Sequence, residues 1–232
     1  GKDGYVFRTD LRLRPDPSVT PVCMGVDAAE RYYASLGRTW ERAAFIKARV
    51  CAGDHSAGIK FLKNMEPFVW RKYLDYAAIS DAHDIRLRIR DHYKTKKGDI
   101  TLPKHNMKLG RGGIRDIEFF TQTHQIIFGG RDKSIRSRAT ITSLRAVADK
   151  KWLPKVLVKD LIENYRFHRT IEHRLQMVND AQTHELPNSD QGFARLACLM
   201  GAEKDELQKE LVDRLSKTNC AIESFFEPQN TD

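Results

Sequence analysis

The sequence predicts a mainly α protein, in which the trailing edge of an α/β domain is followed by a helical bundle. Strict alternation of apolar and polar residues, typical of a strand, occurs near the start of the chain. After Val26, apolar residues recur mostly at helical spacing. The connections between the longer amphipathic segments are short, which favours antiparallel neighbouring helices.

The predicted strand spans Tyr5 to Leu13. Pro15 and Pro17 would end it. Because a lone strand is not stable in water, its sheet partners are expected to lie outside this sequence. One face carries Tyr5, Phe7, Thr9, Leu11 and Leu13, and the other carries Arg8, Asp10, Arg12 and Arg14.

Helices are expected where a capping residue precedes helical periodicity. Asp27 would cap a helix ending at Leu36, and Thr39 would cap one from Trp40 to about Val50. Others are expected near residues 55–65 and 81–94, with Pro67 separating the first from an aromatic-rich stretch over 68–76. In the second part of the chain, helices are expected over 114–128, 141–150, 156–180, 191–199 and 204–226.

Two loops separate these predicted helices. A basic, glycine-containing loop runs from Lys96 to Gly113, and a polar loop runs from Asp180 to Pro187. We place the domain boundary at the start of the first loop. This predicts the end of an α/β domain over residues 1–95 and a helical bundle over residues 96–232.

Composition favours a cytoplasmic protein with anionic partners. Apolar residues make up 41% of the chain, but no apolar run is long enough for a membrane span or a signal segment. The four cysteines form no CxxC or Cys/His cluster, so we expect reduced thiols and no structural zinc. The net charge of +9 favours phosphate, nucleotide, nucleic acid or an acidic protein surface, although a solvated basic surface explains it equally well.

The charged face of the strand is the first candidate site. Asp10 lies between Arg8 and Arg12 on that face, and a carboxylate flanked by guanidinium groups suits a magnesium–phosphate site. The carboxylate would hold the metal ion, and the arginines would hold phosphate oxygens. Cross-strand ion pairs on an exposed face are the alternative, which the pattern alone slightly favours.

Two further cations, Lys47 and Arg49, end a predicted helix that is apolar on most of its turns. Because a buried unpaired charge is costly, both side chains need a partner or water. They could point at a phosphate, but snorkelling or salt-bridged side chains are the more general explanation.

A glycine-rich loop leads from Lys108 into the next predicted helix. Such a loop can bind an anion through free backbone N–H groups, but its spacing matches neither a Walker A motif nor a dinucleotide fingerprint. The polar stripe along the helix suits either an inter-helix hydrogen-bond network or a ligand pocket. It consists of Arg115, Glu118, Gln122 and Gln125.

The region from Arg166 to Pro187 contains no recognisable catalytic motif. His168 and His173 are five positions apart and therefore on different helix faces, which is not the spacing of a metalloprotease motif. Helix termination with side-chain capping is the simplest explanation of the polar string that follows. This string is Gln176, Asp180, Gln182, Thr183 and His184.

Several short blocks, in this order, resemble one known family. The blocks are Arg8–Pro15, Trp40–Arg49, Gly53-Asp54, Pro67–Val69, Lys108–Phe120, Glu172–Gln176, Asp180, Gln182–His184 and Leu186-Pro187. Their series is similar to bifunctional glutamine synthetase adenylyltransferase/adenylyl-removing enzymes, from roughly Tyr5 to Gly201. The resemblance is stronger to the amino-terminal, adenylyl-removing half, chiefly through Lys108-Leu109-Gly110 and the Gln182–His184 loop.

The resemblance implies that residues 1–95 are the C-terminal part of a nucleotidyltransferase domain that acts in nitrogen regulation. Inorganic phosphate would attack the AMP–tyrosine linkage on glutamine synthetase and release ADP, whereas the other half of the enzyme would use ATP to attach AMP. PII signal proteins would regulate the balance, and Mg²⁺ would be the cofactor.

The family's catalytic core has a Gly-Ser motif with two paired carboxylates, and a third carboxylate on a neighbouring strand. Asp10 matches the third position, so the resemblance implies that it is catalytic and binds the metal. The paired carboxylates are expected upstream of Gly1, so we expect the isolated chain to be inactive or nearly so. Phosphate or nucleotide contacts are expected from Arg8, Arg12, Lys47, Arg49, Lys108, Arg115 and Glu118.

Two other functions are compatible with the sequence. The helical bundle could be a non-catalytic module that docks glutamine synthetase or a PII protein. A basic helical nucleic-acid binder ranks last, because no zinc finger, RNA-recognition signature or clear helix-turn-helix is present.

Overall fold

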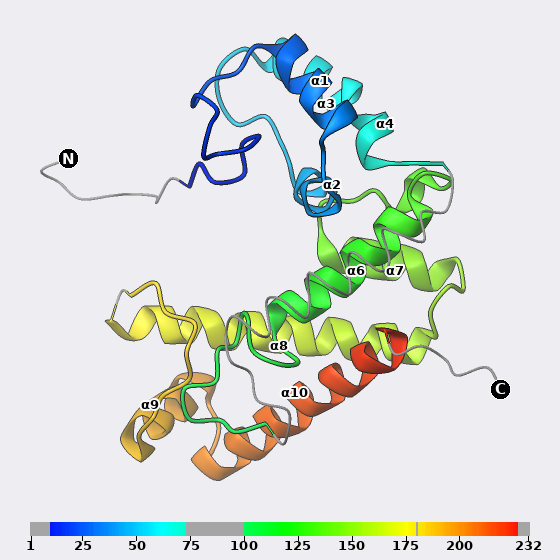
Figure 1. Ribbon diagram of the computed structural model, residues 1–232. Coiled ribbons are helices and arrows are strands. Elements are labelled where there is room, and N and C mark those ends of the chain that lie inside the picture. Colours follow the sequence, from blue (N-terminus) through cyan, green and yellow to red (C-terminus); the bar gives the residue numbers. More distant parts are fainter. Residues whose placement is uncertain (1–9, 73–99, 180, 227–232) are drawn as a thin grey trace, which may run out of the picture.

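The computed structural model describes residues 10–72, 100–179 and 181–226, which fold almost entirely into helices (Figure 1). Within these ranges no strand forms, and one isolated antiparallel bridge joins Asn106 to Glu185. The mainly α fold class is therefore confirmed. None of the described helices combines the length and apolarity needed to cross a lipid bilayer.

The element bounds agree closely with the helical periodicity in the second half of the chain. The bounds of α6 and α10 are those predicted, and those of α7, α8 and α9 differ from the prediction by one residue at each end. The described elements are α1 (Val26–Ser35), α2 (Thr39–Ile46), α3 (His55–Asn64), α4 (Glu66–Val69), α6 (Ile114–Phe128), the 3-10 helix η1 (Lys133–Ile135), α7 (Thr140–Asp149), α8 (Lys155–Asn179), α9 (Asp190–Met200) and α10 (Lys204–Phe226).

The strand prediction is wrong for residues 10–13, which enter a turn instead. The backbone N–H of Arg12 donates to the Asp10 carboxylate at 2.9 Å, and the Arg12 Nε donates to the same carboxylate at 3.0 Å. An Asp side chain that bonds the backbone two residues on favours a turn over an extended strand, and no neighbouring strand is described to compete with it. The rest of the predicted strand, and the helix predicted over 81–94, lie outside the described residues.

The predicted helix caps also need correction. Asp27 lies in the first turn of α1, where a carboxylate is favoured by the helix dipole, and Gly25 is the N-cap. Thr39 is the first residue of α2, and the backbone N–H of its N-cap, Arg38, donates to Glu41 at 2.7 Å. The helix ends at Ile46 rather than at Val50.

Another correction concerns Pro67, which lies inside the short helix α4 rather than between elements. A proline is tolerated there because the first-turn N–H groups of a helix have no intrahelical acceptor. The described residues of the polar loop after α8, 181–187, are not helical, as predicted.

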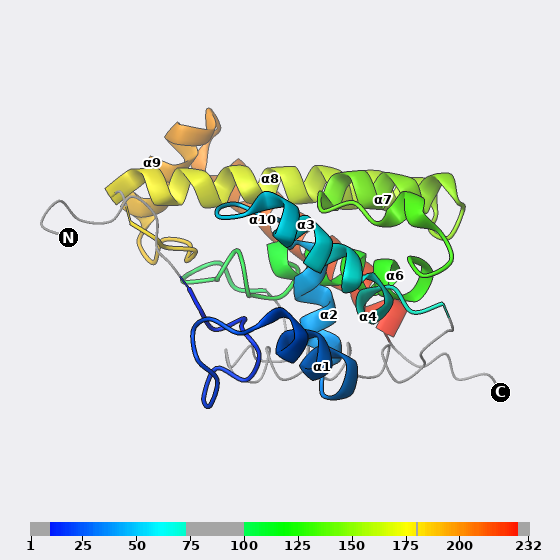
Figure 2. The same cartoon turned by 90° about the horizontal axis from the view of Figure 1, so that it is seen from above.

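Helix α6 is the central element of the described chain. It packs against α2 on one side and against α7, α8 and α10 on the others (Figures 1 and 2). Helices α1, α3 and α4 gather around α2, whereas α9 packs against both α8 and α10. A residue on α6 can therefore face either α2 or the helices α7, α8 and α10.

Three apolar cores form within the described ranges. The first lies between α6, α7, α8 and α10 and includes Ile117 and Phe120. The second joins α8, α9 and α10 to the segment around Met107. The third joins α1, α2 and α4 to Ile126 of α6, so α6 contributes to two cores.

The glycine-rich loop before α6 packs directly onto α10. Gly112 has a φ of 70°, which non-glycine residues rarely adopt. A Cβ atom at this position would lie 2.7 Å from the carbonyl carbon of Leu215 on α10. A glycine is thus required here both for the turn and for the close approach of the two backbones.

Candidate anion-binding site

Three cations from separate elements lie near one another on the described part of the molecule. Lys47 directly follows α2, Arg115 is in the first turn of α6, and Arg169 is in α8. We call these three residues, together with Glu118 and Tyr165, the basic cluster. The pKa of the Lys47 ammonium is lowered, mainly by burial, and the charges of Arg115 and Arg169 lower it further while that of Glu118 opposes them.

Lys47 is held against the start of α7. Its Nζ donates to the Arg138 carbonyl at 2.6 Å and to the Thr140 hydroxyl at 2.9 Å. Although the residue as a whole is exposed, its ammonium group is therefore tucked against protein. This explains why burial is the first cause of its lowered pKa.

Glu118 connects α6 to α8 within the cluster. Its carboxylate accepts a hydrogen bond of 3.0 Å from the Tyr165 hydroxyl and lies 3.7 Å from the Arg115 guanidinium. The pKa of Tyr165 is raised, first by burial and then by the Glu118 charge, so the phenol stays protonated and donates. The Arg169 guanidinium lies over the Tyr165 ring, 6.0 Å from its centroid. This contact places a cation from α8 beside Tyr165, which is bonded to Glu118.

Arg169 is bonded to a buried carboxylate, that of Glu172. Glu172 is 3% exposed and accepts a hydrogen bond of 2.6 Å from Arg169, and its other oxygen lies 2.9 Å from the His184 Nδ1. The backbone carbonyl of His184 in turn accepts from the N–H of Met107 at 2.8 Å. The loop after α8 is therefore tied by its side chain to α8 and by its backbone to the segment before α6.

The glycine-rich loop does not offer free backbone N–H groups to an anion. The N–H groups of Gly113 and Ile114 donate to the carbonyls of Gly110 and Met107, and that of Gly112 donates to the Asp116 carboxylate at 2.9 Å. The hypothesis of a backbone anion site in this loop is wrong for these groups. Their role is to shape the turn that starts α6 and places Arg115.

The Arg-Glu-Gln-Gln stripe on α6 is an inter-helix hydrogen-bond network at its distal end. The Gln125 Nε2 lies 2.6 to 2.8 Å from three acceptors, the Ile135 carbonyl, the Ser137 carbonyl and the Ser143 hydroxyl, which share its two N–H donors. The Gln122 amide donates to the Ala43 carbonyl of α2 at 3.4 Å. Arg115 and Glu118, at the other end of the stripe, belong to the basic cluster.

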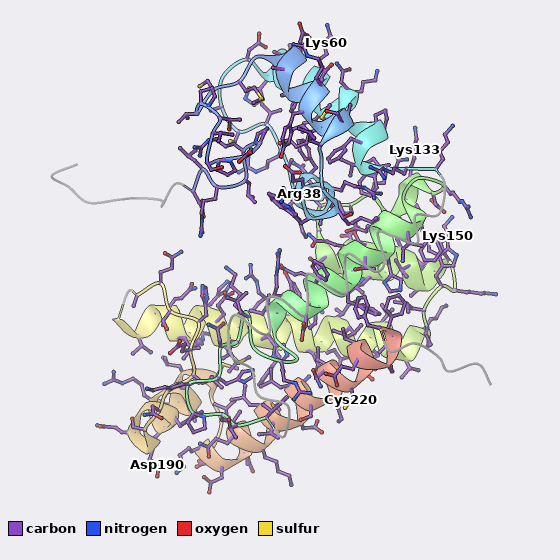
Figure 3. All side chains as sticks on the ribbon, viewed as in Figure 1. Arg38, Lys60, Lys133, Lys150, Asp190 and Cys220 are labelled. Carbon is purple, nitrogen blue, oxygen red and sulfur yellow. The ribbon has the colours of Figure 1, made fainter. Side chains whose placement is uncertain are left out.

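The other predicted site residues are not members of the basic cluster as defined above. Asp10 and Arg12 form a local pair in an exposed turn, and Arg8 lies outside the described residues. Arg49 is exposed in the loop after α2, and Lys108 lies in the turn before α6. Other lysines are spread over the surface, as Lys60, Lys133 and Lys150 show in Figure 3.

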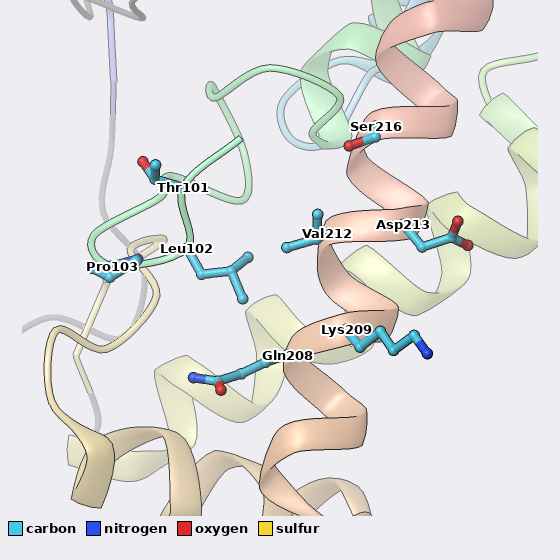
Figure 4. A pocket seen from close by; sticks show the side chains of 8 residues that line it. All are labelled: Thr101, Leu102, Pro103, Gln208, Lys209, Val212, Asp213 and Ser216. Atoms are coloured by element: carbon cyan, nitrogen blue, oxygen red, sulfur yellow. The ribbon is translucent and has the colours of Figure 1, made fainter. Parts of the chain in front are cut away.

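The described residues show two further features away from the basic cluster. His168 is fully buried while His173 is exposed, which confirms that they lie on different faces of α8. An open groove lies between residues 101–103 and α10, with Leu102 pointing towards the helix and Val212 on the opposite wall (Figure 4). Its lining contains none of the predicted site residues.

Known proteins resemble this chain along nearly its whole length. It is 53% identical over 216 residues to the bifunctional glutamine synthetase adenylyltransferase/adenylyl-removing enzyme of Rhizobium meliloti (strain 1021), which covers 93% of the chain. The enzymes of the same name from Brucella melitensis biotype 1 and Bradyrhizobium diazoefficiens are 52% and 46% identical over 97% of the chain. The chain belongs to the glutamine synthetase adenylyltransferase/adenylyl-removing enzyme family.

Two family models divide the chain between them. The glutamate-ammonia ligase adenylyltransferase model matches residues 1–64, and the GlnD PII-uridylyltransferase model matches residues 83–229. The chain spans 22% of the length of the Rhizobium meliloti adenylyltransferase and 23% of that of the Brucella melitensis one. Its basic cluster takes Lys47 from the first matched region and the other members from the second.

Sequence reasoning found Lys47, Arg115 and Glu118 of the basic cluster but missed Tyr165 and Arg169. One available signal is the spacing of Tyr165, Arg169 and Glu172 at i, i+4 and i+7, which puts them on one face of a helix. The Glu172–Gln176 block carries part of the resemblance to the adenylyltransferase/adenylyl-removing family. Nothing in its spacing indicated that Glu172 would meet His184.

Proposed function

We propose that the chain is part of a nucleotidyltransferase that controls glutamine synthetase by removing AMP from a tyrosine through phosphorolysis to ADP, or by adding it. The relatives that cover most of the chain carry the name of this bifunctional enzyme. The resemblance of Lys108-Leu109-Gly110 and the Gln182–His184 loop favours the adenylyl-removing half. We expect this enzyme to act in the cytoplasm, in nitrogen regulation, with ATP, ADP and phosphate as small ligands.

The convergence of Lys47, Arg115 and Glu118 is the observation that carries the proposal. A reaction on phosphoryl groups depends mainly on positioning and on charge that opposes the phosphate oxygens. Lys47 and Arg115 would contact those oxygens, and Glu118, which holds Arg115 and Tyr165, would position them. Arg8, Arg12, Arg49 and Lys108 are proposed as further contacts in the complete enzyme.

Asp10 is proposed as a catalytic, Mg²⁺-binding residue of the complete enzyme. The described residues do not fit a metal site by themselves, because the Asp10 carboxylate is engaged by Arg12 and no group of three or more His, Cys, Asp or Glu side chains in these ranges is placed to hold a metal ion.

The test uses a full-length enzyme that carries this segment, with adenylylated glutamine synthetase as substrate. We expect phosphate-dependent release of ADP and of unmodified tyrosine, and a loss of at least about a hundredfold in Asp10→Asn. Arg195→Gln on the exposed surface of α9 is the matched control and should keep the rate of the unchanged enzyme. Absence of ADP release from the unchanged enzyme would refute the proposed reaction, and an active Asp10→Asn would remove Asp10 from it.

A second candidate function is a docking module for a PII signal protein. The family model that matches residues 83–229 is named for PII-uridylyltransferases, which favours this helical part as the contact. Titration of the chain with a PII protein in a calorimeter should then give saturable binding, and heat of dilution alone would argue against it. A nucleic-acid binder predicts instead an affinity for DNA or RNA that falls steeply with salt.

A further inference from the structure

We propose that Arg169 completes a phosphate-binding site with Lys47 and Arg115, and that Glu172 and His184 position its guanidinium. Arg169, Glu172 and His184 were not among the predicted phosphate contacts. The inference rests on the proposed function only for the biological source of the phosphate. The site itself is argued from the contacts of the basic cluster.

The carboxylate of Glu172 is buried. A buried carboxylate is unfavourable unless it is paired and hydrogen-bonded, and Glu172, at 3% exposed, accepts a hydrogen bond from Arg169 at one oxygen and has the His184 Nδ1 2.9 Å from the other. Arg169 is on the same helix, and His184 is in the loop after it. The hydrogen bond from Arg169 to Glu172 therefore restrains one N–H edge of the guanidinium.

The Arg169 guanidinium is only partly engaged. Its side chain is 40% exposed, although the carboxylate that holds it is buried. Within the described residues its remaining N–H groups have no hydrogen-bond partner, and the guanidinium lies over the Tyr165 ring and acts electrostatically on Tyr165 and Lys47. An ion pair with only a structural role would be expected to bury both partners, whereas here the arginine is partly open to solvent beside Tyr165.

Positive charge is in excess at the basic cluster. Arg115 is 42% exposed, and its ion pair within the described residues is the long one to Glu118 at 3.7 Å. Three cations thus meet two carboxylates, and the cations act on one another, since Arg115 and Arg169 both lower the pKa of Lys47. A local excess of positive charge with unused N–H donors favours an anion.

The ligand class follows from the donors. Two guanidinium groups offer paired N–H bonds to oxygens of one group, and an ammonium adds a compact charge beside them. A phosphate, with several charged oxygens, can satisfy all three, whereas a single carboxylate has two oxygens. The phosphate could be the free ion or the phosphoryl group of a nucleotide.

The first experiment follows arginine side chains by NMR in the unmodified 232-residue chain. The Nε–Hε signal of Arg169 is assigned by its disappearance in Arg169→Lys, and the chain is then titrated with inorganic phosphate, with sodium chloride at equal ionic strength as the control. We expect saturable shifts of the Arg169 and Arg115 signals with phosphate alone. Arg169 and Arg115 signals that stay unchanged with inorganic phosphate, AMP and ADP would overturn the proposal.

Separate titrations with AMP and ADP identify the source of the phosphate. Shifts with inorganic phosphate assign the site to the free ion, and shifts with a nucleotide alone assign it to a phosphoryl group. Failure of all three ligands to move the Arg169 signal would reject the site. This result would leave the proposed function untouched, because that function is measured as ADP release by a complete enzyme.

The second experiment compares variants by calorimetric titration with the phosphate ligand that binds. Arg169→Gln should weaken binding by about tenfold or more, since charge-assisted hydrogen bonds are lost, and Arg169→Lys should recover part of it. Arg195→Gln, which removes the same charge from the surface of α9, should change it by less than about twofold. Equal effects of Arg169→Gln and Arg195→Gln would reduce the site to net charge and refute it.

Glu172→Gln tests the positioning role, because the amide keeps the shape of the side chain but loses its charge. We expect weaker phosphate binding together with a shifted Arg169 Nε–Hε signal in the absence of ligand. A variant that folds and keeps both the signal and the affinity would show that Glu172 does not position Arg169.

Discussion

Gly112 in the loop before α6 lies against the backbone of Leu215 on α10 so closely that a Cβ atom would be 2.7 Å from the carbonyl carbon of Leu215. Gly112→Ala should therefore lower the free energy of unfolding by more than the backbone strain alone, by about 3 kcal/mol or more. Urea unfolding followed by circular dichroism measures this loss.

Gly53→Ala is the matched control for this substitution. Gly53 has a φ of 80°, similar to that of Gly112, but a Cβ there would meet nothing within 4 Å. It should cost only about 1 kcal/mol, from the positive φ. Equal losses at the two positions would contradict the steric argument.

Tyr165→Phe removes the hydrogen bond of 3.0 Å between the Tyr165 hydroxyl and the Glu118 carboxylate. We expect it to lower the free energy of unfolding by about 1 to 2 kcal/mol, because a charged acceptor loses its donor. A double-mutant cycle with Glu118→Gln isolates the bond and should give a coupling of about 1 kcal/mol. Strictly additive losses would mean that the bond does not contribute to stability.

Gln125→Leu should be among the more destabilising changes on α6. The Gln125 side chain is 1% exposed, and its amide serves three acceptors, so leucine would leave buried oxygens without a donor. We expect a loss of about 2 to 4 kcal/mol in urea unfolding. Gln191→Leu on the exposed start of α9 should stay within about 0.5 kcal/mol, and a similar small loss for Gln125→Leu would argue against the network.

Stability should fall in mild acid because His124 and His168 are buried and His105 is partly buried. Burial is the first cause of the lowered pKa in each, to about 4 for His105 and His124 and about 3 for His168, from the usual 6.5. The unfolded chain therefore binds more protons below pH 6.5. The stabilisation is complete above that pH and is lost as the pH falls towards 4, by about 1.4 kcal/mol per pH unit and histidine.

His168→Gln tests the acid effect by urea unfolding at pH 7 and pH 5. The drop in the free energy of unfolding between these two values should be smaller by roughly 2 kcal/mol than in the unchanged chain. His173→Gln, at an exposed position of the same helix, should leave the drop as it is. An identical drop in both variants would show that His168 is not the group that titrates.

The helices of the second half were predictable because their periodicity is long and regular. Over the 15 residues of α6 and the 23 of α10, apolar side chains recur at the spacing that a helix needs to bury one face. The wrong predictions concern short elements, in which a single local contact determines the backbone conformation. The bond from Arg12 to Asp10 makes a turn of residues that alternate like a strand, and Thr39 begins α2 without capping it.

The candidate site was predictable only in part, since its contacts join residues far apart in the sequence. Lys47 was expected to contact phosphate because a cation on a largely apolar helix needs a partner, and Arg115 because it lies on a polar stripe that suits a ligand pocket. Their meeting depends on α2 packing against α6, and that of Glu172 with His184 depends on how the chain turns after α8. Neither relation has a signal in residue spacing.

The place of α6 in two apolar cores has a practical consequence for anyone who shortens this protein. Phe119 and Ile126, at 6% exposed each, are covered by the helices of the first part of the chain, with Trp40 and Ala43 of α2 beside them. A recombinant version that starts after residue 100 would present both side chains to water, next to a Gln122 amide deprived of its acceptor. Such a version should be poorly soluble and prone to aggregation, so α1–α4 are best retained when the helical bundle is produced.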